Sequence, residues 1–310
     1  MSKLVYHTPE IFTEQYSRSF LDSVEPIFRL TKKEVPNFLF DLSKTRKINI
    51  LGLLLIYKFL EYTVENDCFK KPICNINDSK YVSGELERYG FKKLVSAFIN
   101  GVEPNYNLKF KEEDEFFIAP ILLDRNSAIA SVEGQYAGKI NKYYSYDIKA
   151  SFVALQCLGE VSSNFISHAQ DDTKSILAAK GNQEYVEIAC ADTGIGIISS
   201  LKPVFLNNMS GFHVLSRSVE KGITSKLKSA HMGYGLWLIN EFVSVGKGNL
   251  TIFSEGAYFI NNAGKVKSGQ CSYWKGTIIY IKLMMKNTSC YSAVIDSLKK
   301  ECDDINLQRI

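Results

Sequence analysis

Hydrophobic and polar residues in the first third of the chain form blocks that predict strands followed by helices. Strand-like apolar runs cover 36–42 and 72–76, and helix-like segments cover 50–64, 79–89 and 91–98. The segment 50–64 is apolar on most sides, which is typical of a buried helix. Residues 1–30 are mixed and aromatic-rich, and no element is assigned there. Alternating strands and helices predict a small helix-covered sheet, which we place at residues 1–105.

The pattern changes after the polar stretch 101–115, which contains Gly and Pro. Beyond it, strands are predicted at 116–123, 183–191 and 275–281, and helices at 127–144, 147–169 and 231–243. The helix 147–169 repeats apolar residues at three- and four-residue steps, namely Phe152, Leu155, Leu158, Phe165 and Ala169. We expect a second domain at residues 115–290 and a C-terminal helix or tail at residues 291–310. The fold class is α+β.

Composition and charge are those of a globular protein. At 310 residues, with 45% hydrophobic and 23% charged residues, the chain is long enough for two domains. The net charge of +4 comes in no long basic block, so no nucleic-acid partner is expected. No apolar run reaches the roughly 18 residues of a membrane span, and no membrane association is expected. The seven cysteines form no CxxC pair, which is typical of reduced thiols in a cytoplasmic protein.

A polar stripe stands out on the helix 147–169. Glu160, Asn164 and His168 follow one another at four-residue intervals, so they lie on one side of the helix. Such a stripe taken alone is more often a solvated face than a site. The segments that follow change that interpretation.

The strand 183–191 runs into the turn Asp192-Thr-Gly194-Ile-Gly196. Two glycines let a backbone approach a flat ligand without interference from β-carbons. A carboxylate at this place can accept a hydrogen bond from an exocyclic amine, which distinguishes adenine from guanine. A turn of this composition can also be purely structural.

Two glycine-containing segments follow. Gly233-Tyr234-Gly235-Leu236 opens the helix that runs to residue 243, and free amides at a helix N-terminus favour phosphate. Lys275-Gly276-Thr277 opens the last predicted strand. Each of these signals is weak by itself.

The stripe, the turn and the two glycine segments together, in this order, resemble the GHKL superfamily: the ATPase domains of DNA gyrase B, heat-shock chaperones, histidine kinases and MutL. Glu160 to His168 is similar to the N box, Asp192–Gly196 to the first glycine box, and Gly233–Leu236 to the second. The resemblance covers about residues 115–285. It implies a two-layer α/β sandwich with a mixed sheet, the Bergerat fold, and a histidine-kinase-like site for ATP and Mg²⁺.

The resemblance also implies roles for single residues. Asn164 would bind Mg²⁺, and Asp192 would bind the adenine amino group with help from Thr277. Backbone contacts to the nucleotide would come from Gly194, Gly196, Gly233, Tyr234, Gly235 and Leu236. Residues 198–232 would form a lid that orders over nucleotide, and Lys226, His231 and His168 would lie near the phosphates.

Glu160 separates the candidate reactions. A carboxylate one helical turn before Asn164 can orient or deprotonate a nucleophile, or it can hold a water on the metal. Family hydrolases and anti-sigma serine kinases carry Glu at this position. The remaining histidines, His7 and His213, lie in no acidic amphipathic helix, so autophosphorylation of the histidine-kinase type is not expected.

The first domain resembles a STAS domain over about residues 30–100. In that family the turn before the helix carries a phosphorylatable hydroxyl. The matching turn here is Asn49-Ile-Leu-Gly52, which has none. We therefore expect a small α/β interaction module without chemistry of its own.

The leading functional hypothesis is an ATP-hydrolysing protein that switches a partner or its own N-terminal domain. An anti-sigma-type serine/threonine kinase acting on a separate protein, and a non-catalytic nucleotide sensor, are the alternatives. A protein partner is expected in each case, and a homodimer is one open arrangement.

Overall fold

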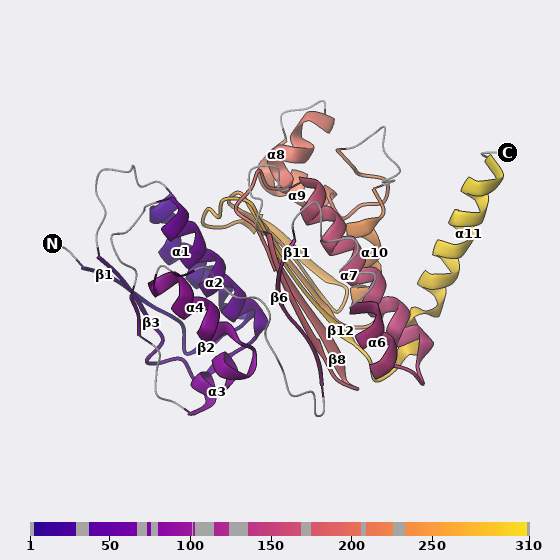
Figure 1. Cartoon of the computed structure of the whole chain (residues 1–310). Coiled ribbons are helices and arrows are strands. Elements are labelled where there is room, and N and C mark those ends of the chain that lie inside the picture. Colours follow the sequence, from indigo (N-terminus) through magenta and orange to yellow (C-terminus); the bar gives the residue numbers. More distant parts are fainter. Residues whose placement is uncertain are drawn as a thin grey trace.

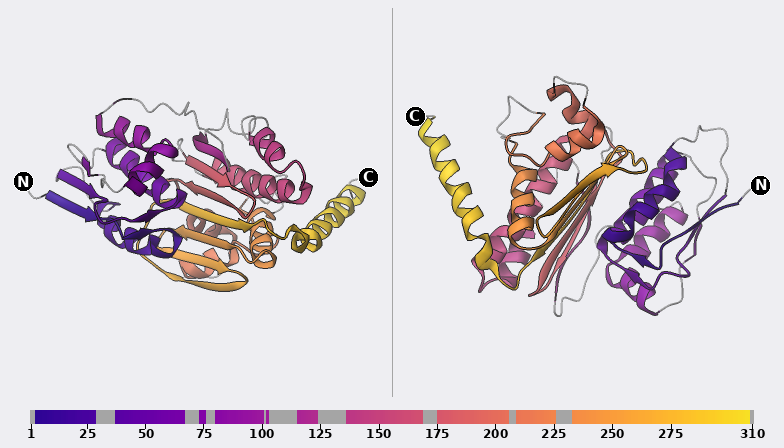
Figure 2. Two further views of the ribbon diagram at one scale, coloured as in Figure 1. Left: turned by 90° about the horizontal axis from the view of Figure 1, so that it is seen from below. Right: turned by 180° about the vertical axis from the view of Figure 1, so that it is seen from behind.

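In the computed structural model, two sheets are separated by a layer of helices (Figure 1). The structure describes residues 3–28, 37–66, 73–75, 80–100, 102, 115–123, 136–168, 175–205, 209–225 and 233–308. The views from below and from behind show the same layers (Figure 2). One further helical layer lies on the far side of the larger sheet.

The larger sheet has seven strands in the order β11-β10-β9-β12-β8-β7-β6. Their bounds are β6 Phe116–Leu123, β7 Ser175–Gly181, β8 Tyr185–Ala191, β9 Asn249–Ser254, β10 Ala257–Asn262, β11 Lys265–Gln270 and β12 Thr277–Met284. All their pairings are antiparallel. Short turns account for this in β7–β8 and in β9–β10–β11, which follow one another directly in the chain. The expected mixed sheet is therefore wrong for the described strands, whereas the α+β class is confirmed.

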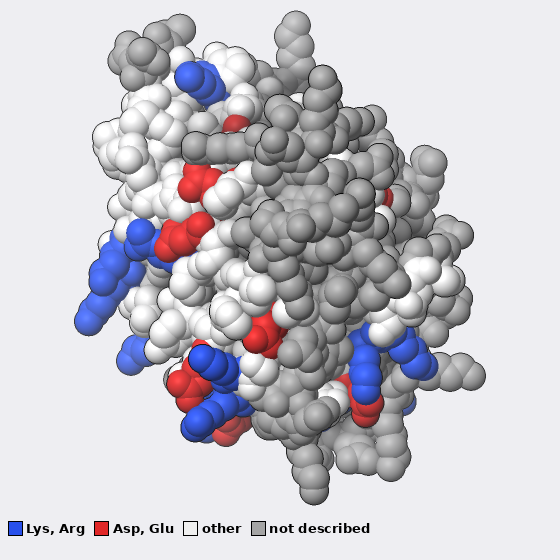
Figure 3. Space-filling model, turned by 90° about the vertical axis from the view of Figure 1, so that its left-hand side faces the viewer, with Lys and Arg blue, Asp and Glu red and all other residues white. Residues whose placement is uncertain are grey.

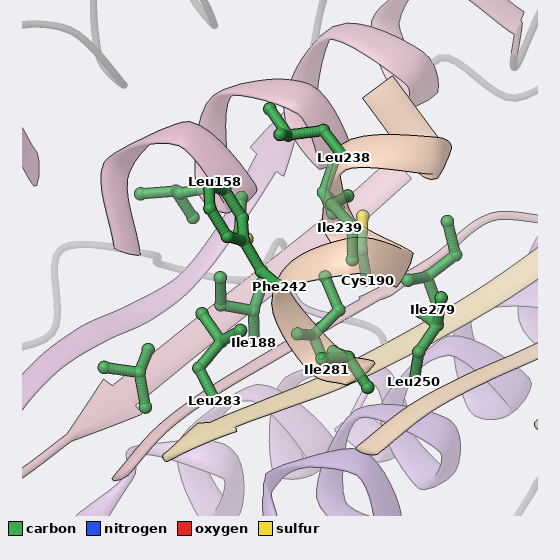
Figure 4. Packing of buried hydrophobic residues seen from close by; sticks show 14 of the residues in the cluster. Leu158, Ile188, Cys190, Leu238, Ile239, Phe242, Leu250, Ile279, Ile281 and Leu283 are labelled. Carbon is green, nitrogen blue, oxygen red and sulfur yellow. The ribbon is translucent and has the colours of Figure 1, made fainter. Parts of the chain in front are cut away.

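Helices α6 (Ala137–Tyr143), α7 (Ile148–His168) and α10 (Gly235–Val245) cover one face of this sheet (Figure 1). Figure 4 shows Leu158 of α7 and Phe242 of α10 above Ile188 of the sheet. The apolar face predicted for α7 is correct at Leu158 and Phe165. Phe152 and Leu155 also pack against this core but are only partly buried, whereas Val153, Ala154, Cys157 and Val161 are fully buried in it.

The helix predicted at 127–144 corresponds to α6 in its second half only. Residues 127–135, which would form its first half, lie outside the described part of the chain. Residue 169, the last of the apolar positions expected on α7, lies outside it as well.

The smaller sheet has the order β1-β3-β5, and all its pairings are parallel. Its strands are β1 Lys3–His7, β3 Asn37–Asp41 and β5 Ile73–Asn75, with helices α1 Ser17–Phe28, α2 Ile50–Glu65, α3 Lys80–Arg88 and α4 Phe91–Asn100. A short parallel pair joins β2 (Ile11–Phe12) to β4 (Lys47–Ile48), and η1 covers Glu14–Tyr16. The strands and helices predicted between residues 36 and 98 are confirmed.

Helix α2 lies between the two sheets and packs against β7 and β8 of the larger one. Nearly all of its side chains are buried, from Ile50 to Thr63, which explains why its sequence is apolar on most sides. One cluster of buried residues joins α1 and α2 to the face of the larger sheet turned away from α7 and α10. The division at residues 105–115 stays a prediction, since residues 103–114 lie outside the described part.

The segment predicted as a lid, 198–232, is largely helical where it is described. It contains α8 (Ile197–Leu201), η3 (Lys202–Val204) and α9 (Gly211–Arg217). Val214 and Leu215 of α9 are fully buried in the core beside β10, so this part of the segment is helical and packed. After β12, η4 (Thr288–Tyr291) leads into α11 (Ser292–Gln308), which extends away from the sheet (Figure 1).

Acidic and basic side chains are interspersed on the N-terminal face. Figure 3 shows Lys and Arg beside Asp and Glu over the described part of that face. Two exposed pairs of opposite charge in the N-terminal region are Arg46–Glu10 and Lys92–Glu87. None of the helices in the described ranges is both long enough and apolar enough to cross a membrane.

Candidate functional site

Helix packing brings the polar stripe of α7 to the first residue of α10. A β-carbon on Gly235 would collide with Oε2 of Glu160 and would lie 3.5 Å from Nδ2 of Asn164. Only a glycine therefore fits here without displacing Glu160. The carboxylate lies at the N-terminal end of α10, where the helix dipole favours negative charge. Residues about 75 positions apart in the sequence thus meet in one place.

Asn164 supplies a second observation at this point. Its Nδ2 atom is buried and has no hydrogen-bond partner among the described residues. A buried polar atom without a partner is costly, and such atoms often mark the place where a water, an ion or a ligand binds. The oxygen and nitrogen of the carboxamide exchange places on rotation, so either atom can face such a ligand.

Glu160 and Asn164 suit a hydrated cation that also binds phosphate. Oxygen ligands and retained waters are what Mg²⁺ prefers, and one or two protein ligands are usual when phosphates supply the others. Over the described residues, no group of three or more His, Cys, Asp or Glu side chains could hold a metal ion. A site of this kind would therefore depend on the phosphates of a ligand.

Asp192 is held rigidly where β8 ends. The residue is 4% exposed, and its Oδ1 accepts hydrogen bonds from the amides of Gly194, at 2.7 Å, and Thr277, at 3.3 Å. The Asp192 amide donates to the Thr277 carbonyl at 2.9 Å. Gly276 has φ of 89°, and a β-carbon there would collide with Oδ1 of Asp192. The first glycine turn and the Gly276-Thr277 segment therefore form one structural unit.

The last residue of β9, Ser254, and the turn residue that follows it, Glu255, complete this unit. The Ser254 hydroxyl accepts from the amide of Ile197 at 3.0 Å and donates to the Gly276 carbonyl at 2.9 Å. Oε2 of Glu255 accepts from the Ser199 amide at 2.8 Å, and its carboxylate also contacts the Ser199 hydroxyl. Glu255 has φ of 49°, a conformation that few non-glycine residues adopt.

The sequence patterns do not point to Ser254 and Glu255 as site residues. The pair Glu255-Gly256 between two apolar runs does suggest a tight hairpin turn, with positive φ at both central residues. Nothing in the sequence indicates that this turn reaches back more than fifty residues to α8. Gly196 is the residue that permits the contact, since a β-carbon there would collide with the Glu255 carboxylate.

The second glycine segment forms the entrance to α10. Gly233 has φ of 70°, and its carbonyl accepts a hydrogen bond from the Gly222 amide at 3.1 Å. Tyr234 precedes the first helical residue, and its ring packs edge-on against Trp237. The ammonium of Lys221 lies 5.4 Å and 4.8 Å from the centres of these two rings. Leu236 packs against the core.

Three predicted residues cannot be placed in the site. Lys226 and His231 lie outside the described residues, and the same holds for the side chain of His168, whose backbone ends α7. The other predicted residues form two groups, one around Gly235 and one around Asp192. Beneath the first group, burial raises the pKa of Cys157 far above its usual range, and the charge of Glu160 adds to this effect. Its thiol is therefore neutral and is no candidate nucleophile.

No protein-family model matches the chain, and no curated protein matches it significantly.

Proposed function

We propose that this protein binds Mg-ATP in a site of the GHKL type and hydrolyses the nucleotide. One observation carries the proposal: α7 presents Glu160 and Asn164 to the first residue of α10, while Asp192 is fixed by the amides of Gly194 and Thr277. The combination provides a carboxylate for a base, a carboxamide for a metal and helix-terminal amides for phosphate.

Each group has a chemical task in this proposal. The Asp192 carboxylate accepts a hydrogen bond from the amino group of adenine, and the Thr277 hydroxyl assists it. The amides at the start of α10, around Gly235, receive phosphate oxygens. Asn164 offers its side-chain oxygen to Mg²⁺, which supplies charge neutralisation for the phosphates when it is bound.

Glu160 is the proposed catalytic residue. It accepts a proton from a water that attacks the γ-phosphorus, while the bond between that phosphorus and the bridging oxygen of ADP breaks. Its position at the N-terminus of α10 places the carboxylate close to the phosphate-binding amides.

The architecture supports the same proposal. A seven-stranded sheet with α7 and α10 on one face is a two-layer arrangement of the kind that the resemblance implies. For the N-terminal region we propose a STAS-like interaction module. Asn49 there accepts a hydrogen bond from the Gly52 amide at 3.1 Å and so caps α2, which is a structural task that needs no phosphorylation.

Binding of labelled ADP and ATP with Mg²⁺ tests the proposal. We expect Asp192→Ala to abolish binding, and Glu160→Ala to retain binding but lose phosphate release by about a hundredfold or more, as for other general bases. Glu241→Ala, on α10 but away from Gly235, is the matched control and keeps both. Absence of binding, or binding that Asp192→Ala leaves unchanged, contradicts the proposal.

The same assay with γ-labelled ATP distinguishes the reactions. Release of inorganic phosphate supports hydrolysis. Transfer of label to a Ser or Thr of an added protein identifies a kinase instead, and tight binding without turnover identifies a sensor.

A further inference from the structure

Helix α1 of the N-terminal region contacts the segment 271–276, which leads into β12. The Ser272 hydroxyl donates to Oδ1 of Asp22 at 2.6 Å. Phe28 packs edge-on against Tyr273 and Trp274, with ring centres 6.0 Å and 5.3 Å apart. These contacts join two parts of the chain that are about 250 residues apart in sequence.

Trp274 contacts both α1 and Asp192. Its indole Nε1 donates to the carbonyl oxygen of Asp192 at 2.9 Å, and its own carbonyl accepts from the Glu255 amide at 3.2 Å. The side chain is fully buried, and Phe20 of α1 lies beside it with ring centres 6.3 Å apart. The ring of Trp274 thus packs against α1, and its N–H is hydrogen-bonded to the residue proposed to recognise adenine.

The backbone of Asp192 is consequently held on both sides. Its amide donates a hydrogen bond to the Thr277 carbonyl, and its own carbonyl accepts one from the indole N–H of Trp274. A buried indole N–H needs a hydrogen-bond acceptor. Any nearby carbonyl could serve, so the choice of the Asp192 carbonyl is specific to this fold. Because interiors are densely packed, a shift of α1 against Trp274 is transmitted to this carbonyl and not absorbed by empty space.

We infer that Trp274 is a positioning residue through which α1 sets the direction of the Asp192 carboxylate, so that the N-terminal region regulates adenine recognition. The inference rests on the proposed nucleotide site. Linkage makes the effect reciprocal: a ligand or partner that shifts α1 changes nucleotide affinity, and nucleotide binding changes the α1 contact.

The test compares ADP with inosine diphosphate, which lacks the 6-amino group. Trp274→Phe keeps an aromatic ring in the core but removes the N–H donor to Asp192. We expect it to lower ADP affinity by about tenfold, the usual worth of one well-placed hydrogen bond, and to change inosine diphosphate affinity by less than about twofold. A purely structural role would weaken both nucleotides equally.

A pair of α1 variants tests the coupling without touching Trp274. Phe28→Leu removes the aromatic contact with Tyr273 and Trp274, whereas Val24→Ala shortens a buried aliphatic side chain of the same helix. We expect Phe28→Leu to reduce the ratio of ADP to inosine diphosphate affinity and Val24→Ala to leave it unchanged, at matched fractions of folded protein.

The outcomes separate the two proposals. If the wild type binds no ADP, both are overturned. If the wild type binds ADP and discriminates against inosine diphosphate, but Trp274→Phe and Phe28→Leu keep the same ratio, only the inference about Trp274 is overturned. Should Trp274→Phe fail to fold, the comparison of Phe28→Leu with Val24→Ala still decides.

Discussion

The two faces of the seven-stranded sheet are built differently. Toward α7 and α10, strands β8 and β12 present apolar side chains along most of their length, including Ile188, Cys190 and Ile281. Toward the N-terminal helices the same strands present Glu187 and Tyr280, which are both buried. Polar groups on the first face are gathered at one end, in the candidate site, whereas on the second face they lie inside the contact between the two parts of the chain.

The buried polar groups of the second face depend on one another. The Tyr280 hydroxyl donates to Oε1 of Glu187 at 2.8 Å, and Lys180 Nζ lies 3.6 Å from Oε2. Within α2, Lys58 Nζ and Glu61 Oε2 are 2.5 Å apart, and both side chains are 1% exposed. Apolar contacts tolerate exchange of one residue for another of similar size, but buried charges do not tolerate loss of a partner. The packing of the N-terminal helices on the second face should therefore be more specific than the packing of α7 and α10 on the first.

Breaking the ion pair of α2 should have the largest effect on stability. Glu61→Leu leaves the Lys58 ammonium buried without its carboxylate, and we expect a loss of about 3–5 kcal/mol in the free energy of unfolding. Denaturant titration measures it. The double variant Lys58→Met with Glu61→Leu removes both charges and should recover most of the loss. If the single variant is as stable as the double one, the charges are not what makes this face specific.

Adjacent residues of β12 give a direct comparison of the faces. Tyr280→Phe removes a hydrogen bond to a buried carboxylate and should cost about 1.5–3 kcal/mol. Ile281→Val, on the opposite face, removes one methylene and should cost about 0.5–1.5 kcal/mol. Thermal unfolding of both variants under one condition ranks them. Equal losses would show that the buried polar contact adds nothing beyond packing.

Local patterns predict most of the elements around the site. The period of α7 and the alternation of β8 follow from burial of one or both faces, so the sequence alone places Glu160, Asn164 and Asp192 on their elements. Helix α1 also carries a period, with Phe20, Leu21, Val24 and Ile27 buried. That period is hard to recognise in the sequence because Pro26 lies inside the helix and polar residues dominate its start.

The contacts between distant elements do not follow from local patterns. Trp274 and Glu255 each have ordinary neighbours in sequence, and their roles arise from hydrogen bonds to residues far away in the chain. The edge strand β11 escapes prediction for another reason: its side chains are mostly exposed and Lys-rich, which protects an edge but leaves no apolar alternation.

The smallest expected effect concerns Glu14, at the polar margin of the second face. Burial raises the pKa of its carboxyl, and Glu187 adds to the rise, against the opposing influence of Lys282 and of the hydrogen bond from Asn49. The folded protein therefore binds this proton more tightly than the unfolded chain does. Its contribution to stability is fully present below the ordinary pKa of Glu and is lost as pH rises through the raised value.

Glu14→Gln removes this titration and keeps an oxygen that can accept from Asn49, whose Nδ2 lies 2.9 Å from Oε2. We expect the variant to equal the wild type near pH 4 and to be slightly more stable at pH 7. Chemical denaturation at both pH values measures the difference. Glu10 is an exposed carboxylate nearby, and the control variant Glu10→Gln should leave the stability unchanged at both pH values. A variant less stable than the wild type at pH 7 would mean that the partners of Glu14 stabilise its ionised form. The charges on the second face would then be favourable pairs that add to stability.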